Sequence, residues 1–221
     1  MKRMKNSLRY IGILAVMAVG MTSCGKTNNR KLTNDWKVVS YLEESNYSSS
    51  GGNYHTTVSM TENEVTHSFH QEPANGQSVS NSQTGSVKAH EFIIKKDGTW
   101  SYLQEISFPH NGSGNDNRIE HSGTWSFLKK NKGDDFEKNE RIHFNILETK
   151  GLETLYAGGV VIYSNSNQQT FLTGENVLVY VVKTSKKDAL ELELEKDYAH
   201  TSDPGTGFHN TTIRKMTLAV K

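Results

Sequence analysis

Cysteine is almost absent from this chain, in which Cys24 is the single one among 221 residues. A lone cysteine cannot form an internal disulfide, so burial of side chains must hold the fold together. Proline occurs only three times and alanine is scarce after residue 24, whereas Gly, Ser, Thr and Asn are abundant. This composition argues against a helical bundle, because alanine is the strongest helix former.

An excess of positive charge is missing as well. The chain has 25 Lys and Arg residues against 24 Asp and Glu residues. Four of the positive residues, Lys2, Arg3, Lys5 and Arg9, precede Cys24, and no acidic residue does. Removing them leaves 21 − 24 = −3 for the remainder. We expect no nucleic-acid partner, because binding to phosphates needs a basic surface.

An export pattern is present at the N-terminus. The positive residues precede an apolar run of 11 residues at 11–21. That run is too short to cross a hydrocarbon core of roughly 30 Å as a helix, which is typical of a signal peptide. The small residues Thr22 and Ser23 then precede Cys24 and suit the narrow pockets of a signal peptidase. We therefore predict a signal peptide over residues 1–23.

The stretch Met21-Thr22-Ser23-Cys24-Gly25 resembles the lipobox of bacterial lipoproteins. The resemblance implies cleavage before Cys24 and a covalent lipid on its thiol, and two or more acyl chains give stable anchoring to a membrane. The alternative is an ordinary cleavage site followed by an incidental cysteine. Residues 24–30 would form a tether to a domain over 31–221. No acidic residue occurs in 25–31, and we expect an outer-membrane anchor facing the periplasm.

Short runs rich in Val, Ile, Thr, Tyr and Phe predict an all-β domain. Leu190, Leu192 and Leu194 alternate with glutamates, a spacing that aligns them on a strand and scatters them around a helix. Asp97-Gly98 suits the positive φ angles of a tight hairpin. The predicted strands and hairpin units cover 35–42, 57–60, 65–69, 91–106, 123–127, 141–147, 155–163, 169–172, 177–182, 189–195 and 215–220.

Polar segments separate many of these strands, at 26–34, 45–57, 71–86, 110–118 and 164–169. The strand at 35–42 places Trp36, Val38 and Leu42 on one face. The closing strand at 215–220 could pair with it and so remove open edges. We predict an antiparallel up-and-down barrel of about nine or ten strands.

Five pieces of the sequence resemble the lipocalin-like lipoprotein domains of Gram-negative envelopes. They are the opening tryptophan strand at 31–38 and the segments 92–100, 123–127, 178–182 and 188–194. The resemblance implies a barrel whose mouth could hold a small apolar ligand. It carries no catalytic residues.

Aromatic residues recur after two Gly-Thr pairs. Trp100 and Tyr102 share one strand face, and Trp125 and Phe127 share another. Such a pattern is more often hydrophobic core than ligand site. Because barrels of this size can also hold one small ligand, these four residues are the candidate lining of a cavity.

Catalytic motifs are missing. No HExxH and no Gly-x-Ser-x-Gly pattern occurs, and we expect no enzyme. His67 and His70 are separated by an odd number of positions, so they point to opposite faces of a strand. Other histidines could converge at one barrel end from predicted loops: His55, His110, His121, His200 and His209. We predict no metal site, and no cofactor apart from the lipid on Cys24.

Two functions remain open at this point. The first is a membrane-anchored module that binds a small apolar ligand. The second is a non-enzymatic accessory subunit that contacts another envelope protein.

Overall fold

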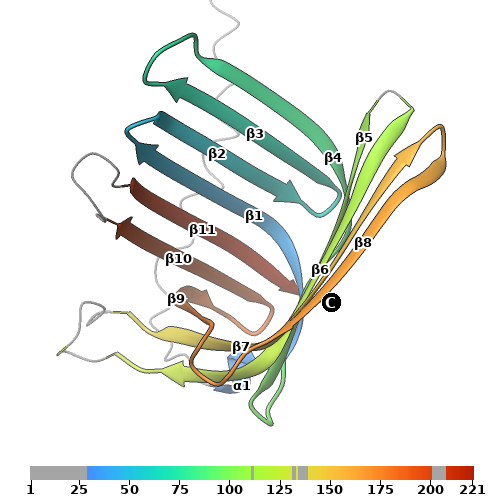
Figure 1. The fold of residues 1–221 in the computed structure, drawn as a ribbon. Helices are drawn as coiled ribbons and strands as arrows, with labels where there is room; N and C mark the ends of the chain where they lie inside the picture. Colours follow the sequence, from blue (N-terminus) through green and yellow to red (C-terminus); the bar gives the residue numbers. More distant parts are fainter. Residues whose placement is uncertain (1–28, 111, 131–132, 134–138, 201–207) are drawn as a thin grey trace, which may run out of the picture.

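The computed structural model describes residues 29–110, 112–130, 133, 139–200 and 208–221, without the side chains of 29, 30, 110 and 195–200. Within them, one helical turn precedes eleven strands, which form a single antiparallel sheet that closes into a barrel (Figure 1). This confirms the all-β barrel. The elements are α1 (Asn29–Leu32), β1 (Asn34–Ser49), β2 (Gly52–Thr61), β3 (Glu64–Pro73), β4 (Val79–Ile94), β5 (Thr99–His110), β6 (Ser113–Leu128), β7 (Arg141–Ala157), β8 (Val160–Thr170), β9 (Val177–Ser185), β10 (Ala189–His200) and β11 (Phe208–Val220).

The barrel has two halves with different strand pairings. A ring of ten strands closes through β6 and β7, and β8 is attached to β7 outside that ring. At one end, which we call the lower half, β1 also pairs directly with β4, because the β2–β3 hairpin is inserted only above this point. The lower half is therefore an eight-stranded ring of β1, β4, β5, β6, β7, β9, β10 and β11.

The lower half is filled by side chains. Trp36 and Phe144 are completely buried there, and Trp100 packs against Phe144 with ring centroids 4.7 Å apart. Leu32 from α1 is also fully buried, and its carbonyl oxygen accepts a hydrogen bond of 2.9 Å from Nε1 of Trp36. The helical turn, which begins inside the predicted tether, thus packs its last residue into the hydrophobic core of the barrel.

A β-bulge corrects the predicted faces of the first strand. The pairing of β1 with β11 shifts between Val38 and Ser40. The extra residue reverses the alternation beyond it, so Tyr41 joins Trp36 and Val38 in the core and Leu42 does not. The prediction that Leu42 shares a face with Trp36 is therefore wrong.

Most of the polar segments expected between strands are themselves parts of strands. Residues 79–86, 113–118 and 164–169 lie within β4, β6 and β8. Backbone hydrogen bonds to neighbouring strands hold these residues in the sheet, although the segments have no apolar face. The predicted strand at 155–163 instead spans the β7–β8 hairpin. Residues 155–157 end β7, Gly158 and Gly159 form the turn with φ of 58° and 77°, and residues 160–163 begin β8.

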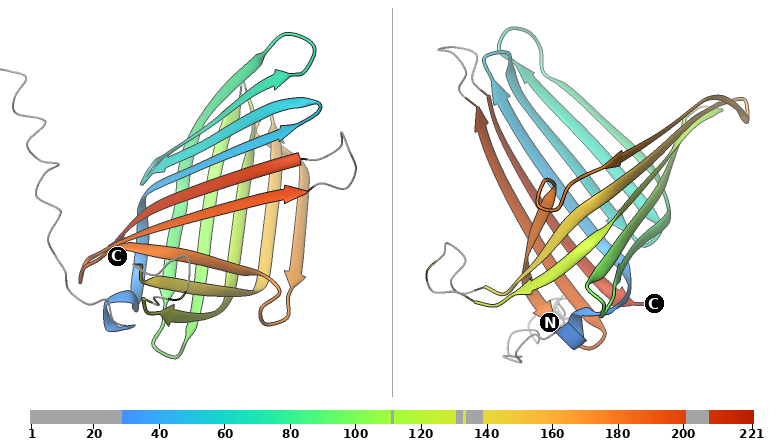
Figure 2. Two further views of the ribbon diagram at one scale, coloured as in Figure 1. Left: turned by 90° about the vertical axis from the view of Figure 1, so that its left-hand side faces the viewer. Right: turned by 60° about the horizontal axis from the view of Figure 1, so that its bottom comes forward.

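In the upper half, the sheet divides into two walls that diverge upward (Figure 1). One wall contains β1, β2, β3, β10, β11 and the part of β4 that pairs with β3, and the other contains β5 to β8. The right-hand view of Figure 2 shows β8 running apart from β10 and β11. Many side chains on the inner faces are half-buried or exposed here, as for Ile119, which is 37% exposed. The described residues contain no helix long and apolar enough to span a membrane.

Candidate functional site

A layer of polar side chains lies inside the barrel, next to the hydrophobic core. Glu43 on β1 is paired with Arg214 on β11, and both share the inner face with the buried Tyr41. Nε of Arg214 donates a hydrogen bond of 2.6 Å to Glu43, and the Tyr41 hydroxyl donates to the same carboxylate oxygen. Glu43 thus joins a cation and a phenol from two strands.

Burial controls protonation in this layer. It raises the pKa of Tyr41 far above its usual value, and the pKa values of Tyr102 and Tyr180 rise for the same reason. Burial acts against the charge of Arg214, but the groups of Tyr41, Tyr180 and Glu43 outweigh it and raise the Arg214 pKa. The tyrosines therefore remain hydrogen-bond donors and the guanidinium keeps its charge at neutral pH.

Two histidines extend the layer across β4, β5 and β6. His90 is 2% exposed, and its Nε2 lies 3.1 Å from the Tyr102 hydroxyl. Burial lowers the His90 pKa to about 4, and Nδ1 has no hydrogen-bond partner among the described residues. His121 stacks on Tyr102, and its Nδ1 lies 2.9 Å from Oγ1 of Thr149. Burial and the Arg214 charge lower the His121 pKa, so both histidines are neutral at pH 7.

Above this layer, four aromatic rings cluster on the inner face of β1, β2, β3 and β11. Tyr47 contacts Tyr54 and Phe208 at centroid distances of 5.7 and 5.5 Å, and Tyr54 contacts Phe69 at 6.2 Å. Tyr54 also accepts a hydrogen bond from the Gln71 amide. All four rings are half-buried, unlike those of the lower core. We call Tyr47, Tyr54, Phe69 and Phe208 the upper aromatic cluster.

The candidate lining residues lie lower in the barrel than this cluster. Trp100 and Trp125 belong to the hydrophobic core, and Phe127 packs against it. Nε1 of Trp125 donates to the Lys95 carbonyl, which fixes the ring. Tyr102 alone of the four reaches the polar layer. Whether any of them contacts a ligand stays a prediction.

Sequence reasoning missed Glu43, Arg214 and the upper aromatic cluster. A signal for Arg214 was present, since it precedes Met216 and Leu218 at strand spacing and therefore shares their inward face. No comparable signal marked Glu43, because the bulge before Tyr41 reverses the alternation that would have placed it.

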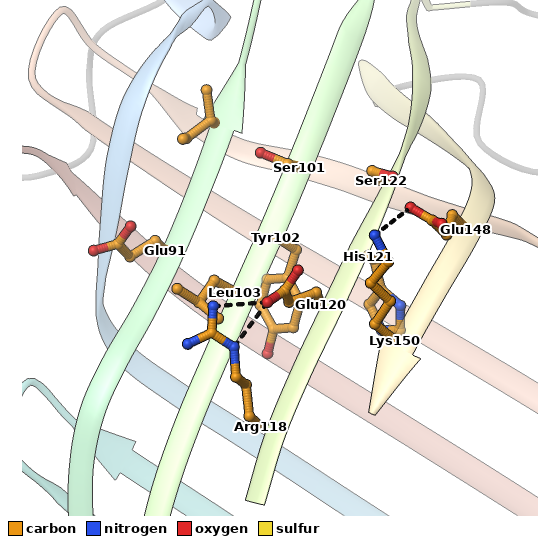
Figure 3. Close-up of a pocket in the computed structure, with 11 residues that line it drawn as sticks. Glu91, Ser101, Tyr102, Leu103, Arg118, Glu120, His121, Ser122, Glu148 and Lys150 are labelled. Carbon is orange, nitrogen blue, oxygen red and sulfur yellow. Dashed lines mark hydrogen bonds and ion pairs between the residues drawn. The ribbon is translucent and has the colours of Figure 1, made fainter. Parts of the chain in front are cut away.

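The outer surface has a separate hollow of about 300 Å³ over β4 to β7 (Figure 3). Arg118 projects over it and is paired with Glu120 at 2.7 Å and with Glu105 at 3.0 Å. Lys150 and Glu148 form another pair at 3.1 Å. These charges already neutralise one another in exposed positions, so the hollow lacks a charge that selects a ligand.

The histidines expected in or near loops lie on strands, with His110 and His200 at strand ends. His55 on β2 is directly opposite His70 on β3 on the outer face. Their Nδ1 atoms lie 2.6 and 2.7 Å from side-chain oxygens of Asn46 and Ser80. Across the described part of the chain, no three His, Cys, Asp or Glu side chains are placed to hold a metal ion.

Cys24 lies outside the described residues, as does the predicted signal peptide. The inner layer offers hydrogen-bond donors and acceptors beside half-buried aromatic rings, which suits the binding of a small molecule that is polar at one end. Comparison with known proteins adds no family: no protein-family model, no curated protein and no solved structure matches this chain.

Proposed function

We propose that this protein is a membrane-anchored envelope lipoprotein that binds a small, largely apolar ligand between the diverging walls of the barrel. The observation that carries the proposal is the half-buried state of the upper aromatic cluster. Tyr47, Tyr54, Phe69 and Phe208 point inward, yet among the described residues they are not part of the hydrophobic core. Aromatic rings left open on a concave inner face are typical of ligand sites.

The polar layer would form the floor of this site. Arg214, Glu43 and Tyr41 are connected to each other by hydrogen bonds, so the floor is polar without an unpaired charge. A ligand with an apolar body and one hydrogen-bonding end fits this order of surfaces. Below the floor, the packed core around Trp36 and Phe144 leaves the lower half to a structural role.

The lipid anchor gives the barrel an orientation. Leu32 of α1 lies in the core, next to Trp36 at the start of β1. Asn29 is five positions after Cys24 (29 − 24), and a chain of that length can span at most about 18 Å. The lower half would therefore be nearest the membrane. The diverging walls would then face away from it, toward the periplasm.

Displacement of an environment-sensitive fluorescent fatty acid tests the proposal. Tryptophan emission is a poor probe, because Trp36, Trp100 and Trp125 belong to the core. We expect saturable binding that Tyr54→Ala weakens about tenfold, through the loss of roughly 1.5 kcal/mol of aromatic contact.

Tyr156→Ala is the matched control. Tyr156 is also a half-buried tyrosine on a strand, but its hydroxyl contacts Asp116 on the outer face. Its truncation should leave the affinity unchanged. Equal loss of affinity in both variants, or no saturable binding of fatty acids and other small apolar probes, would refute a site at the upper aromatic cluster.

A further inference from the structure

The ion pair in the floor of the proposed site is open to the space above it. The side chains of Arg214 and Glu43 are 30% and 24% exposed. The core residues Trp36 and Phe144 below them are completely buried. Because the pair lies on the inner face and the lower half is filled, solvent reaches the two side chains from between the diverging walls. A ligand that enters there can contact both of them.

Glu43 keeps one oxygen atom for such a ligand. Nε of Arg214 and the hydroxyl of Tyr41 both donate to Oε2 of its carboxylate. No described residue donates a hydrogen bond to Oε1. Because a carboxylate oxygen has two lone pairs, Oε1 remains a hydrogen-bond acceptor. A donor on the ligand can therefore bind to it.

The charges of the pair cancel each other. Among the described side chains, Arg214 and Glu43 are the charged groups that act on the three tyrosines of the floor. A ligand carboxylate beside Arg214 would lie close to Glu43, and a ligand ammonium beside Glu43 would lie close to Arg214. Either group would lose its hydration without meeting an unpaired opposite charge. The floor therefore disfavours both kinds of charged ligand.

Hydroxyl groups continue this uncharged surface toward the upper aromatic cluster. Ser45 lies between Glu43 and Tyr47 on the inner face of β1, and its Oγ is 3.1 Å from Oγ1 of Thr212 on β11. Serine and threonine hydroxyls both donate and accept hydrogen bonds. Along β1, the site thus passes from aromatic rings to hydroxyls and then to a neutralised ion pair.

We propose that the ligand ends in an uncharged group that both donates and accepts hydrogen bonds, such as the hydroxyl of a fatty alcohol or a monoacylglycerol. This inference rests on the proposed function, because it specifies the polar end of the ligand of the same site. The ligand hydroxyl donates to Oε1 of Glu43 and accepts from the guanidinium of Arg214. A carboxylate has no proton to donate to Oε1, and an ammonium has no lone pair to accept from Arg214.

Three ligands that share one alkyl chain and differ at the polar end test the proposal: dodecanol, dodecanoate and dodecylammonium. Each competes at pH 7 against N-phenylnaphthylamine, an uncharged fluorophore whose emission rises in apolar surroundings. We expect dodecanol to displace the fluorophore at a concentration at least tenfold below that of the other two ligands, because they give up the hydration of a charge.

Glu43→Gln distinguishes the effect of the ion pair from the general preference of an apolar site for uncharged molecules. The glutamine oxygen can still accept from Arg214 and Tyr41, but the charge of Arg214 is then unpaired. The affinity for dodecanoate should rise at least tenfold relative to that for dodecanol. Arg214→Gln leaves the opposite charge unpaired, so it should raise the relative affinity for dodecylammonium instead.

Glu62→Gln is the matched control. Glu62 forms an ion pair of 2.8 Å with Lys37 in exposed positions, and its substitution should leave all relative affinities unchanged. Binding of dodecanoate as tight as that of dodecanol by the wild-type chain would overturn the inference and leave the proposed function in place. So would unchanged relative affinities in Glu43→Gln and Arg214→Gln variants whose circular dichroism matches the wild type. Failure of all three ligands to displace the fluorophore would instead refute the proposed function, and the inference with it.

Discussion

His90 makes the stability of the barrel depend on pH in a calculable way. The folded protein lowers the pKa of this histidine from 6.5 to about 4, because the ring is buried. The unfolded chain therefore takes up the proton at a higher pH than the folded chain does. His90 contributes its full stability above pH 6.5, and this contribution is lost as the pH falls toward 4. The difference between the two pKa values, about 2.5 (6.5 − 4), corresponds to roughly 3 kcal/mol of folding free energy.

Urea unfolding at pH 7, 6, 5 and 4 measures this loss. The emission of Trp36, Trp100 and Trp125 should report it, since all three lie in the core. His90→Gln is the comparison, because glutamine does not titrate but can still hydrogen-bond the hydroxyl of Tyr102.

The difference between the two pH profiles isolates His90 from other groups, among them His121, whose pKa is also lowered. We expect the wild-type chain to lose roughly 3 kcal/mol more than His90→Gln between pH 7 and 4. Parallel profiles would show that His90 is not kept neutral by burial.

Three further outcomes are expected. Gly123→Ala should destabilise the barrel by about 1–3 kcal/mol in urea unfolding, because an added Cβ would overlap the carbonyl of Asn145, whereas Gly51→Ala should be nearly neutral because its nearest contact is a side-chain hydroxyl. Trp100→Ala should cost about 3–5 kcal/mol by the same measurement, and a loss below 1 kcal/mol would contradict its place in a packed core. Cys24→Ser should move the protein from the membrane to the soluble fraction of fractionated cells, and a variant still bound there would refute the lipid anchor.

The lower half of the barrel could be predicted from the sequence because its strands alternate between core and solvent. Leu190, Leu192 and Leu194 are buried as the spacing indicates. The hairpin turn at Gly98 has the expected positive φ of 85°. The pairing of β11 with β1 likewise confirms that the last strand joins the first.

The upper half was missed because its strands lack that alternation. Residues 79–86 and 164–169 are exposed on both faces for most of their length, and backbone hydrogen bonds to β3, β5 and β7 hold them. Hydrophobic periodicity carries no information about such strands. The polar layer was missed for a related reason, since its charged residues form hydrogen bonds with residues that are far away in the sequence. Arg214 and Glu43 are 171 positions apart.

The pairing of β1 with β11 also determines when the barrel can fold. Trp36 is opposite Val220, a residue synthesised 184 positions later (220 − 36). At about 5–20 residues per second, β1 waits roughly 10–40 s for its partner. During that time the ring cannot close, and the face that carries Trp36 and Val38 remains uncovered. Such long-range closure is slow even after synthesis. A cell that makes this protein must therefore prevent aggregation through the apolar side chains of β1 until β11 has been synthesised.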